Sequence, residues 1–464
     1  FPAGLLPRPP PPPLPPPPPP PPPPGRMLSR HAADAKTEPL LSAAPSPSDA
    51  AAARRRGGHS AWQAAQALFK AVMGTGIFAL PPAIRASGYA LGSLTCLAMA
   101  ALSLYSTVAI LRAVEALRAQ GVGRETDGRI EFQQATAIAY PRANWLVSLL
   151  CVLGQLGSVL SYFDFVVANL QSVAPAFLSR TGYVLLIAAL VAPLALLRST
   201  AHPAFGLAMS FGNVALVTAL GSVLWYGAAA SSASWAELRP ADPSGLGLVF
   251  GVTAVMFSCQ LEAVSIEQDM AEREKIYSLL QWLFVLLALL FTSFGLAVYA
   301  MFGEATGRAR LPGGEWLELT ILHNLGKGGA PLKLVKLAMS VNLTLMTPIT
   351  LLPATKIVEQ RVLQQLRLPF TTAACSVVRL LVVASLAVTA SVLTNFELIT
   401  GLTGSLGSIT CFTFPALIYL HFCGVRLSPA ERVFAYAVAL IGACGFVVSI
   451  GQVLFNIIFG SSRA

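Results

Sequence analysis

Long apolar runs separated by short polar stretches most constrain how this chain can fold. A helix needs about 20 consecutive apolar residues to cross a bilayer, and about eleven runs approach that length here. They lie near residues 65–86, 89–112, 145–168, 181–198, 204–227, 246–266, 278–302, 331–355, 373–394, 397–421 and 430–459. The sequence therefore predicts an all-α polytopic membrane protein with about eleven transmembrane helices.

The charged residues agree with this interpretation. Only 11% of the 464 residues are charged, whereas 55% are hydrophobic and the mean hydropathy is +0.66; soluble proteins carry roughly 25% charged residues. The net charge of +10 does not form an arginine-rich face interleaved with aromatic residues, which argues against nucleic acid as a partner. Lysine and arginine are more frequent in loops on the side of the N-terminal tail, so we expect that tail to be cytosolic and the C-terminus to lie outside.

The first residues have a different composition. Residues 1–24 are mostly proline, and the following stretch contains "AAPSPSDAAA" and three arginines. Such a segment lacks core-forming residues, so we expect residues 1–60 to be a disordered, proline-rich and basic cytosolic tail. Met27 is the first methionine and a candidate start of translation.

The first apolar run is interrupted near its middle. It places Gly74 and Gly76 around Thr75, and the pair Pro81 and Pro82 follows. Unpaired backbone groups are costly in hydrocarbon, so an unwound segment survives only where it lines a cavity within the protein. The free amides at such a break suit an anionic group such as a carboxylate. The alternative is that the glycines permit close packing of helices.

A second interruption favours the cavity. The sixth run reads "VFGVTAVMFSCQLEAVSIEQDM" over residues 249–270 and contains the polar residues Ser258, Cys259, Gln260 and Glu262. The first and sixth runs occupy corresponding positions if the chain is an inverted repeat of five plus five segments. Broken helices at corresponding positions are typical of the binding site of a secondary transporter.

Five motifs in order resemble the amino acid/auxin permease family, and the resemblance covers nearly all of 61–460. They are "GTGIFALPPAIRASGYALG" (74–92), "SYFDFVVANL" (161–170), "IEQDM" (266–270), "LTLMTPITLLP" (343–353) and "NFELITGLTGSLGSITCFTFPALIYL" (395–420). The resemblance implies a transporter domain over 61–460 with an APC/LeuT-type fold of five plus five helices and one more, and amino acids as substrates. Two departures put the subfamily in doubt, because Ala271 follows Met270 where the family usually has proline, and the outer-loop cysteine pair of animal members is missing.

Lys70 bears on the coupling ion. Sodium-coupled members of the family commonly have asparagine at this position, so the lysine resembles proton-coupled amino acid transporters. An ammonium group can occupy the place of a metal cation and would repel one. The alternative is that Lys70 snorkels to the headgroups. Thr344 and Thr347 could have supplied oxygens to sodium, and beside Lys70 we expect them to bond backbone carbonyls or substrate.

Together these residues predict alternating access around a pocket halfway through the membrane. Backbone amides near Gly74, Thr75 and Gly76 would bind the substrate carboxylate. Groups near Ser258 and Cys259 would bind its ammonium. Tyr162 would form part of a gate, and Lys70 with Asp164 or Glu262 would couple protons or stabilise the empty cavity. Arg379 lies near a helix end, and we expect it to snorkel.

Two other classes of protein compete with a carrier. A transporter-shaped sensor would bind amino acids and signal without net flux. A membrane-embedded enzyme is disfavoured because no His/Asp pair, metal-spaced cluster or nucleophile elbow occurs in the spans. The seven cysteines form no CxxC or Cys/His cluster, so we expect no metal, cofactor or disulfide framework. The plasma membrane and the vacuolar or lysosomal membrane remain alternatives.

Overall fold

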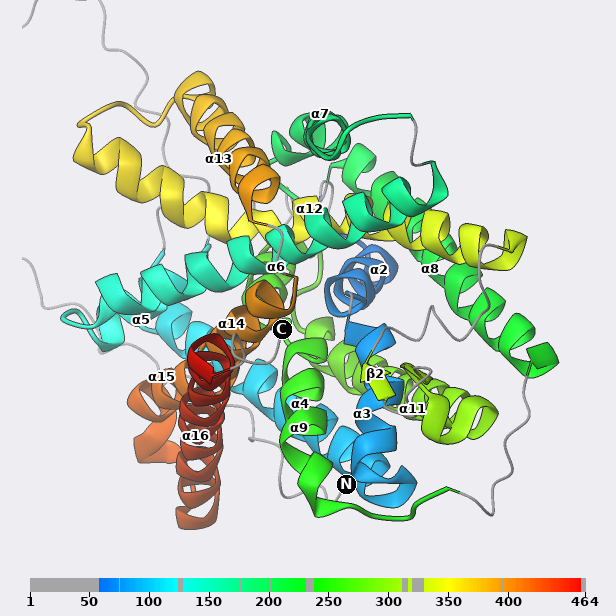
Figure 1. The fold of residues 1–464 in the computed structure, drawn as a ribbon. Coiled ribbons are helices and arrows are strands. Elements are labelled where there is room, and N and C mark those ends of the chain that lie inside the picture. Colours follow the sequence, from blue (N-terminus) through cyan, green and yellow to red (C-terminus); the bar gives the residue numbers. More distant parts are fainter. Residues whose placement is uncertain are drawn as a thin grey trace, which may run out of the picture.

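The computed structural model describes residues 58–74, 76–123, 128–174, 177–200, 202–230, 238–310, 316–318, 329–393 and 396–459. These residues form a bundle of long helices that cross one another at varied angles (Figure 1). The predicted tail lies almost wholly outside the described residues, and so does Thr75.

Helices make up nearly all of the described chain. Up to the second interruption they are α2 Ala61–Val72, α3 Gly76–Ser87, α4 Tyr89–Ala119, α5 Phe132–Ala139, α6 Asn144–Val173, α7 Arg180–Ala195, α8 Pro203–Ala230 and α9 Leu246–Met256. Beyond it they are α10 Gln260–Asp269, α11 Lys275–Phe302, α12 Ala330–Gln365, α13 Thr372–Val392, α14 Phe396–Ser408, α15 Phe414–Cys423 and α16 Pro429–Phe459. Short helical segments adjoin them, namely η3 Pro243–Gly245, η4 Gly303–Ala305, η6 Ile409–Thr413 and η7 Gly424–Arg426.

Every predicted apolar run coincides with a helical segment. By length and composition, 9 of the described spans can each cross a membrane, and the pair α2 and α3, bent by 55°, brings the total to 10. The remaining run is α7, an apolar helix of 16 residues, which is shorter than the usual crossing length. The all-α polytopic prediction is confirmed, whereas the count of about eleven is not.

The order of the segments follows a five-plus-five plan. The first set comprises α2 with α3, α4, α6, α7 and α8; the second comprises α9 with α10, α11, α12, α13 and α14 to α15; α16 follows. Each set opens with an interrupted segment. The third members, α6 and α12, pack against each other, and α3 packs against α9 (Figure 1). Both interruptions are thereby brought to the middle of the bundle.

Apolar side chains both fill the interior of the bundle and cover much of its surface. One large cluster of apolar side chains fills the interior between the helices. Many large apolar side chains are exposed, including Trp225 at 75% and Trp282 at 75%. Exposure on this scale is unfavourable in water and expected in hydrocarbon, because lipid tails are as apolar as the side chains themselves. The chain is therefore a multi-pass integral membrane protein.

Two features differ from the expectations. A short antiparallel hairpin of β1 Arg308–Arg310 and β2 Trp316–Glu318 lies in the long connection between α11 and α12, where no strand was expected. The snorkelling expected of Arg379 is wrong, because this residue is only 2% exposed. Its Nε donates to Glu359 Oε1 at 2.5 Å, and its Nη1 donates to the carbonyls of Ala195 and Leu197 at 3.0 and 2.6 Å.

These bonds make a testable prediction about stability. Arg379→Met would leave a buried carboxylate without its partner and two carbonyls at the end of α7 without a donor. Such a loss costs about 3–5 kcal/mol, so we expect a clearly lower melting temperature for the purified protein in detergent. The exposed Arg432 offers a matched control, and Arg432→Met should melt close to the wild type. Equal melting of the two variants would contradict this prediction.

Candidate functional site

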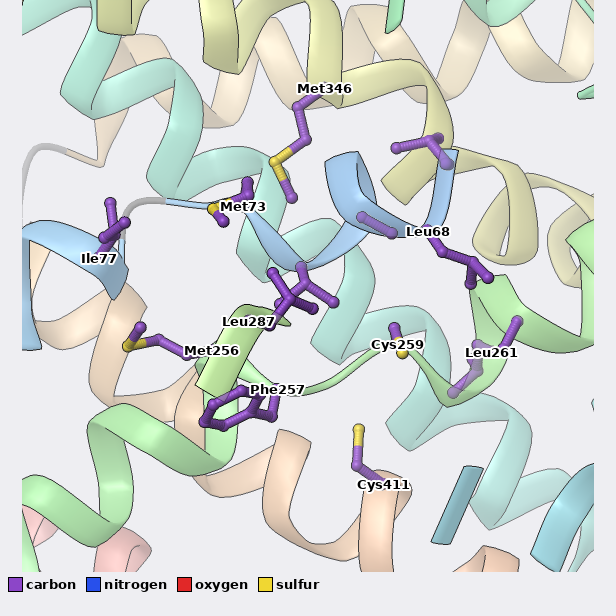
Figure 2. Packing of buried hydrophobic residues seen from close by; sticks show 14 of the residues in the cluster. Leu68, Met73, Ile77, Met256, Phe257, Cys259, Leu261, Leu287, Met346 and Cys411 are labelled. Atoms are coloured by element: carbon purple, nitrogen blue, oxygen red, sulfur yellow. The ribbon is translucent and has the colours of Figure 1, made fainter. Parts of the chain in front are cut away.

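The first interruption separates α2 from α3. α2 ends at Val72, and Met73 leaves the helical conformation with φ −85° and ψ 63°. α3 begins at Gly76, where a Cβ would lie 2.5 Å from Cγ of Met256 at the end of α9. The glycine thus lets the two interrupted segments touch. Figure 2 shows both within one packed region, with Met73 beside the first and Met256, Phe257 and Cys259 along the second.

Two polar side chains stabilise the first interruption. Nδ2 of Asn342, on α12, lies 3.4 Å from the carbonyl of Met73 and donates to it. Lys70 is 0% exposed, and its Nζ donates to the carbonyl of Asn342 at 2.8 Å and also to Asn342 Oδ1. Lys70 therefore does not snorkel. Its Nζ group joins α2 to α12.

The second interruption is held by side chains of a similar kind. Residues Phe257 to Cys259 separate α9 from α10. Ser103 Oγ, on α4, donates to the carbonyl of Phe257 and accepts from Gln260 Nε2 at 3.0 Å. Gln260 Oε1 accepts the backbone N–H of Cys259 at 3.0 Å. Backbone groups that a continuous helix would pair internally are thus paired by side chains.

A cavity lies between the two interruptions. The predicted site residues that line it are Gly74, Gly76, Tyr162, Ser258 and Glu262. The structure therefore brings together residues from α6, from both breaks and from the start of α10. Gly74 lies close to Tyr162, since a Cβ on Gly74 would lie 3.2 Å from the Tyr162 hydroxyl.

Other predicted site residues do not line the cavity. Cys259 is buried beside it. Thr344 Oγ1 donates to the Ser340 carbonyl at 2.7 Å, and Thr347 Oγ1 donates to the Leu343 carbonyl at 3.0 Å. Both hydroxyls therefore bond the preceding turn of their own helix, as is common for threonine.

Asp164 also lies outside the cavity lining. Its carboxylate forms an ion pair with Nη2 of Arg180, at the start of α7. The carboxylate expected as a partner of Lys70 is thus paired with a different cation, and the partner of Lys70 is Asn342. A role of Asp164 in carrying protons stays a prediction.

Sequence reasoning missed several polar groups of the lining. Gln155 Nε2 donates to Glu262 Oε1 at 2.7 Å. Thr350 comes from α12 and Thr403 from α14. On α6, the lining residues recur every three or four positions, which places them on one face of the helix: Cys151, Gly154, Gln155, Ser158, Ser161 and Tyr162. This spacing is visible in the sequence and could have identified the face.

The helix that follows α14 also changes geometry beside the cavity. Segment η6, Ile409–Thr413, is a π-helix, and its residues Thr410 and Cys411 belong to the cavity lining. Ser106 Oγ donates to the Cys411 carbonyl. Single π turns inside α-helices occur frequently at functional sites. No sequence pattern that we recognised predicted this turn.

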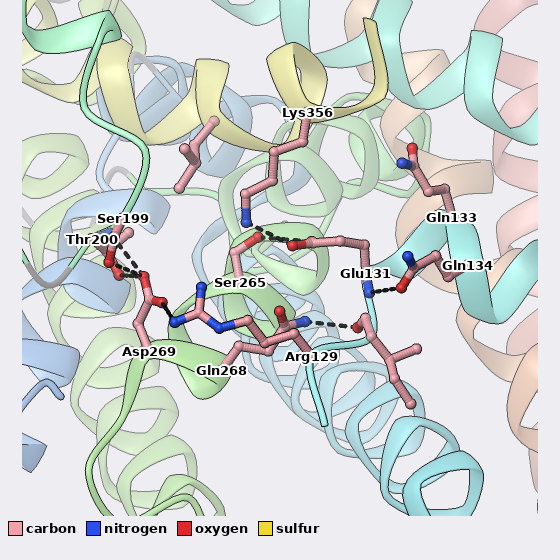
Figure 3. A network of polar contacts seen from close by, with 12 residues as sticks. Arg129, Glu131, Gln133, Gln134, Ser199, Thr200, Ser265, Gln268, Asp269 and Lys356 are labelled. Carbon is pink, nitrogen blue, oxygen red and sulfur yellow. Dashed lines mark hydrogen bonds and ion pairs between the residues drawn. The ribbon is translucent and has the colours of Figure 1, made fainter. Parts of the chain in front are cut away.

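A separate polar network lies around the C-terminal end of α10 (Figure 3). Asp269 accepts hydrogen bonds from Ser199 and Thr200 and pairs with Arg129 at 3.3 Å. Nearby, Lys356 pairs with Glu131 at 2.7 Å. We call these six residues the α10-end network. Leu261 lines both the cavity and a smaller pocket that Glu131 and Lys356 also line.

A helix bundle in which two interrupted segments face one cavity defines a membrane transport protein of the inverted-repeat class. The sequence model described as "Transmembrane amino acid transporter protein" matches residues 57–457. The chain belongs to this family, which confirms the family resemblance of the sequence.

Several known proteins are similar to this chain in sequence or in fold. Amino acid transporter ANT1 of Arabidopsis thaliana is 24% identical over 388 residues, which is 80% of this chain and 86% of that protein. Amino acid transporter AVT3B of the same plant is 22% identical over 394 residues, or 81% of this chain and 88% of that protein. A solved Na⁺-coupled sialic acid symporter has a TM-score of 0.55 at 13% identity, covering 89% of this chain and 96% of its own. The Eremococcus coleocola manganese transporter scores 0.51 at 14% identity, over 87% of this chain and 90% of its own. These neighbours show a LeuT-type fold.

Gly212 of α8 yields a prediction about the Lys70 contact. A Cβ at this glycine would lie 2.3 Å from Nζ and 2.8 Å from Cε of Lys70. Gly212→Ala should therefore displace the ammonium from Asn342 and destabilise the protein by about 1–3 kcal/mol. We expect a lower melting temperature in detergent.

The same helix supplies matched controls. A Cβ on Gly206 or Gly221 would meet nothing within 4 Å. Alanine exceeds glycine in helix propensity by about 1 kcal/mol, so Gly206→Ala and Gly221→Ala should melt at or above the wild-type temperature. A Gly212→Ala variant that behaves like these controls would show that the ammonium does not need this space.

Proposed function

We propose that this chain is a secondary active transporter that moves amino acids across a membrane by alternating access. The observation that carries the proposal is the pair of interrupted segments facing one cavity in a chain of this family. Unwound backbone offers hydrogen-bonding groups that an intact helix cannot, and a zwitterion needs donors and acceptors close together. The relatives ANT1 and AVT3B, both named amino acid transporters, support the same class of substrate.

The substrate would bind between the two breaks. Amides near Gly74, Thr75 and Gly76 take the carboxylate, at the N-terminus of α3, where the helix dipole favours negative charge. Carbonyl and hydroxyl groups near Ser258 and Cys259 take the ammonium, at the C-terminal end of α9. The Tyr162 ring, packed against Gly74, closes over the bound molecule.

The position of Lys70 supports sodium-independent, proton-coupled transport. Lys70 binds two oxygens of Asn342 between α2 and α12, where a metal ion would have to displace an ammonium. Glu262 lies on the cavity wall and Asp164 lies on α6, where it pairs with Arg180; these two carboxylates would bind the protons.

The α10-end network would be the closed gate of the state described here. The backbone of His59, next to α2, pairs with α10, since its N–H donates to the Asp269 carbonyl at 2.7 Å and its carbonyl accepts from Ala271 at 2.9 Å. The network therefore lies on the side of the N-terminal tail. The excess of basic residues in the loops on that side favours a cytosolic location, in which case opening the network would release substrate inward.

Uptake measurements test the proposal directly. In proteoliposomes containing the full chain, we expect radiolabelled amino acid uptake to rise with an inward proton gradient and to be unchanged when sodium is replaced by an impermeant cation. Lys70→Met removes bonds from a charged donor, so proton-driven uptake should fall about tenfold or more. The exposed Lys333 provides the control Lys333→Met. Sodium-dependent uptake by the wild type would contradict the role given to Lys70.

Two cysteines allow substrate binding to be observed without transport. Cys151 and Cys411 line the cavity, whereas Cys423 is half-buried and Cys444 is exposed. In a Cys423→Ser, Cys444→Ser background, a small methanethiosulfonate reagent should modify the cavity thiols, and a transported amino acid should slow this reaction. Adding Cys151→Ser and Cys411→Ser should abolish the protected fraction. Protection without uptake under any gradient would instead identify a sensor.

A further inference from the structure

Glu262, inside the cavity, affects whether a proton must accompany each substrate. This inference rests on the proposed function. Glu262 is the only charged residue among the described residues that line the cavity. It is 6% exposed, and the described chain provides no lysine, arginine or histidine in ion-pair contact with it. The Lys70 side chain is buried, is bound to Asn342 and does not line the cavity.

The surroundings of Glu262 are polar but uncharged. Gln155 of α6 donates to Oε1. The titratable groups that lie close enough to interact electrostatically are Cys151 and Tyr162 of α6, Cys259 at the break and Cys411 of η6. None of these is a cation in either protonation state. Glu262 also lies in the first turn of α10, where the helix dipole favours an ionised carboxylate.

Closing the cavity around a substrate raises the free energy of an ionised Glu262. While the cavity is open or holds only water, that water stabilises the carboxylate, but closing both gates around a substrate displaces it. A buried and unpaired charge strongly disfavours the closed state. A neutral amino acid is a zwitterion, and its two charges are already assigned to the helix breaks. It brings no net charge to balance Glu262.

Two species can neutralise the carboxylate. One is a proton on Glu262. The other is a cationic side chain, which would reach from the substrate backbone toward α6 and η6. Gly154, Ser158 and Gly407 belong to the same cavity lining and have no side chain or a small one. The closed cavity can therefore hold either a proton on Glu262 or a cationic substrate side chain. Holding both would leave one excess positive charge.

We propose that Glu262 makes proton coupling depend on the substrate: each neutral amino acid crosses with one proton on Glu262, and each lysine or arginine crosses with none. In the first case hydronium on one side protonates the carboxylate, and water on the other side takes the proton from it. In the second case the ammonium or guanidinium pairs with the ionised carboxylate. In both cases the empty carrier returns with Glu262 ionised, because water fills the empty cavity and solvates the carboxylate. One net positive charge crosses with either class of substrate.

The test compares the two substrates on the wild-type protein. Proteoliposomes are loaded with a pH-sensitive dye, and uptake of labelled alanine or lysine is measured with an inside-negative potential and no initial pH gradient. We expect alanine uptake to acidify the lumen with close to one proton per molecule. We expect lysine uptake to depend on the potential to the same degree and to leave the lumen pH unchanged.

Variants at one position sharpen the test. Glu262→Gln keeps the shape but removes the charge, so lysine uptake should fall about tenfold or more, because hydrogen bonds to charged groups contribute that much. Alanine uptake should persist without proton movement. Glu262→Asp keeps the charge and should retain the difference between the substrates. Glu272→Gln, at an exposed carboxylate paired with Lys275, is the matched control and should behave like the wild type.

Several results would overturn the inference while leaving the transporter in place. They are alanine uptake that brings no proton, lysine uptake that acidifies the lumen as alanine does, or uptake of alanine but not of lysine. A Glu262→Gln variant with unchanged proton movement would overturn it as well. If that variant does not fold, the wild-type comparison and Glu262→Asp still decide. Absence of uptake of both substrates under every gradient would instead refute the proposed function.

Discussion

Backbone hydrogen bonding in a solvent without water is the constraint on which this structure depends. A helix that unwinds inside hydrocarbon leaves groups that only the protein can pair. At the first interruption, the Asn342 amide bonds the Met73 carbonyl, and at the second, the Gln260 amide bonds the Cys259 N–H. Each amide side chain replaces part of the missing turn. Because each also bonds a second residue, Lys70 or Ser103, each interruption is tied to a different helix.

These ties determine which elements can move independently. Lys70 joins α2 to α12, and the space it needs is left by Gly212 of α8. Ser103 joins the second interruption to α4. At the other end of α10, Arg118 of α4 forms two bonds of 2.6 Å with Glu267, while Asp269 binds the connection between α7 and α8. The half-helix α10 is therefore held at its broken end by the Gln260 amide and at its far end by ion pairs.

Much of the architecture could be predicted from the sequence, because its physical causes repeat along the chain. Hydropathy located the long helices, and the Gly74 to Gly76 motif located the first break. Asn342 gave no signal, since one asparagine in an apolar run has no periodicity. Arg379 was misjudged because its partners, Glu359 and the carbonyls after α7, are brought to it only by tertiary packing. Thr344 and Thr347 were expected to bond backbone carbonyls or substrate, and their hydroxyls bond carbonyls of their own helix.

The two buried charges near the centre of the bundle have different surroundings, and this difference separates their roles. Lys70 is satisfied within the protein by two oxygens of Asn342, so neither its charge nor its position requires a ligand. Glu262 receives one hydrogen bond from a neutral amide and otherwise faces the cavity. A polar side chain whose hydrogen bonds are already completed within the fold acts as part of the scaffold. A carboxylate that faces the cavity without a cation from the protein can be neutralised only by a proton or by a cationic substrate. The number of protons carried with each substrate follows from this.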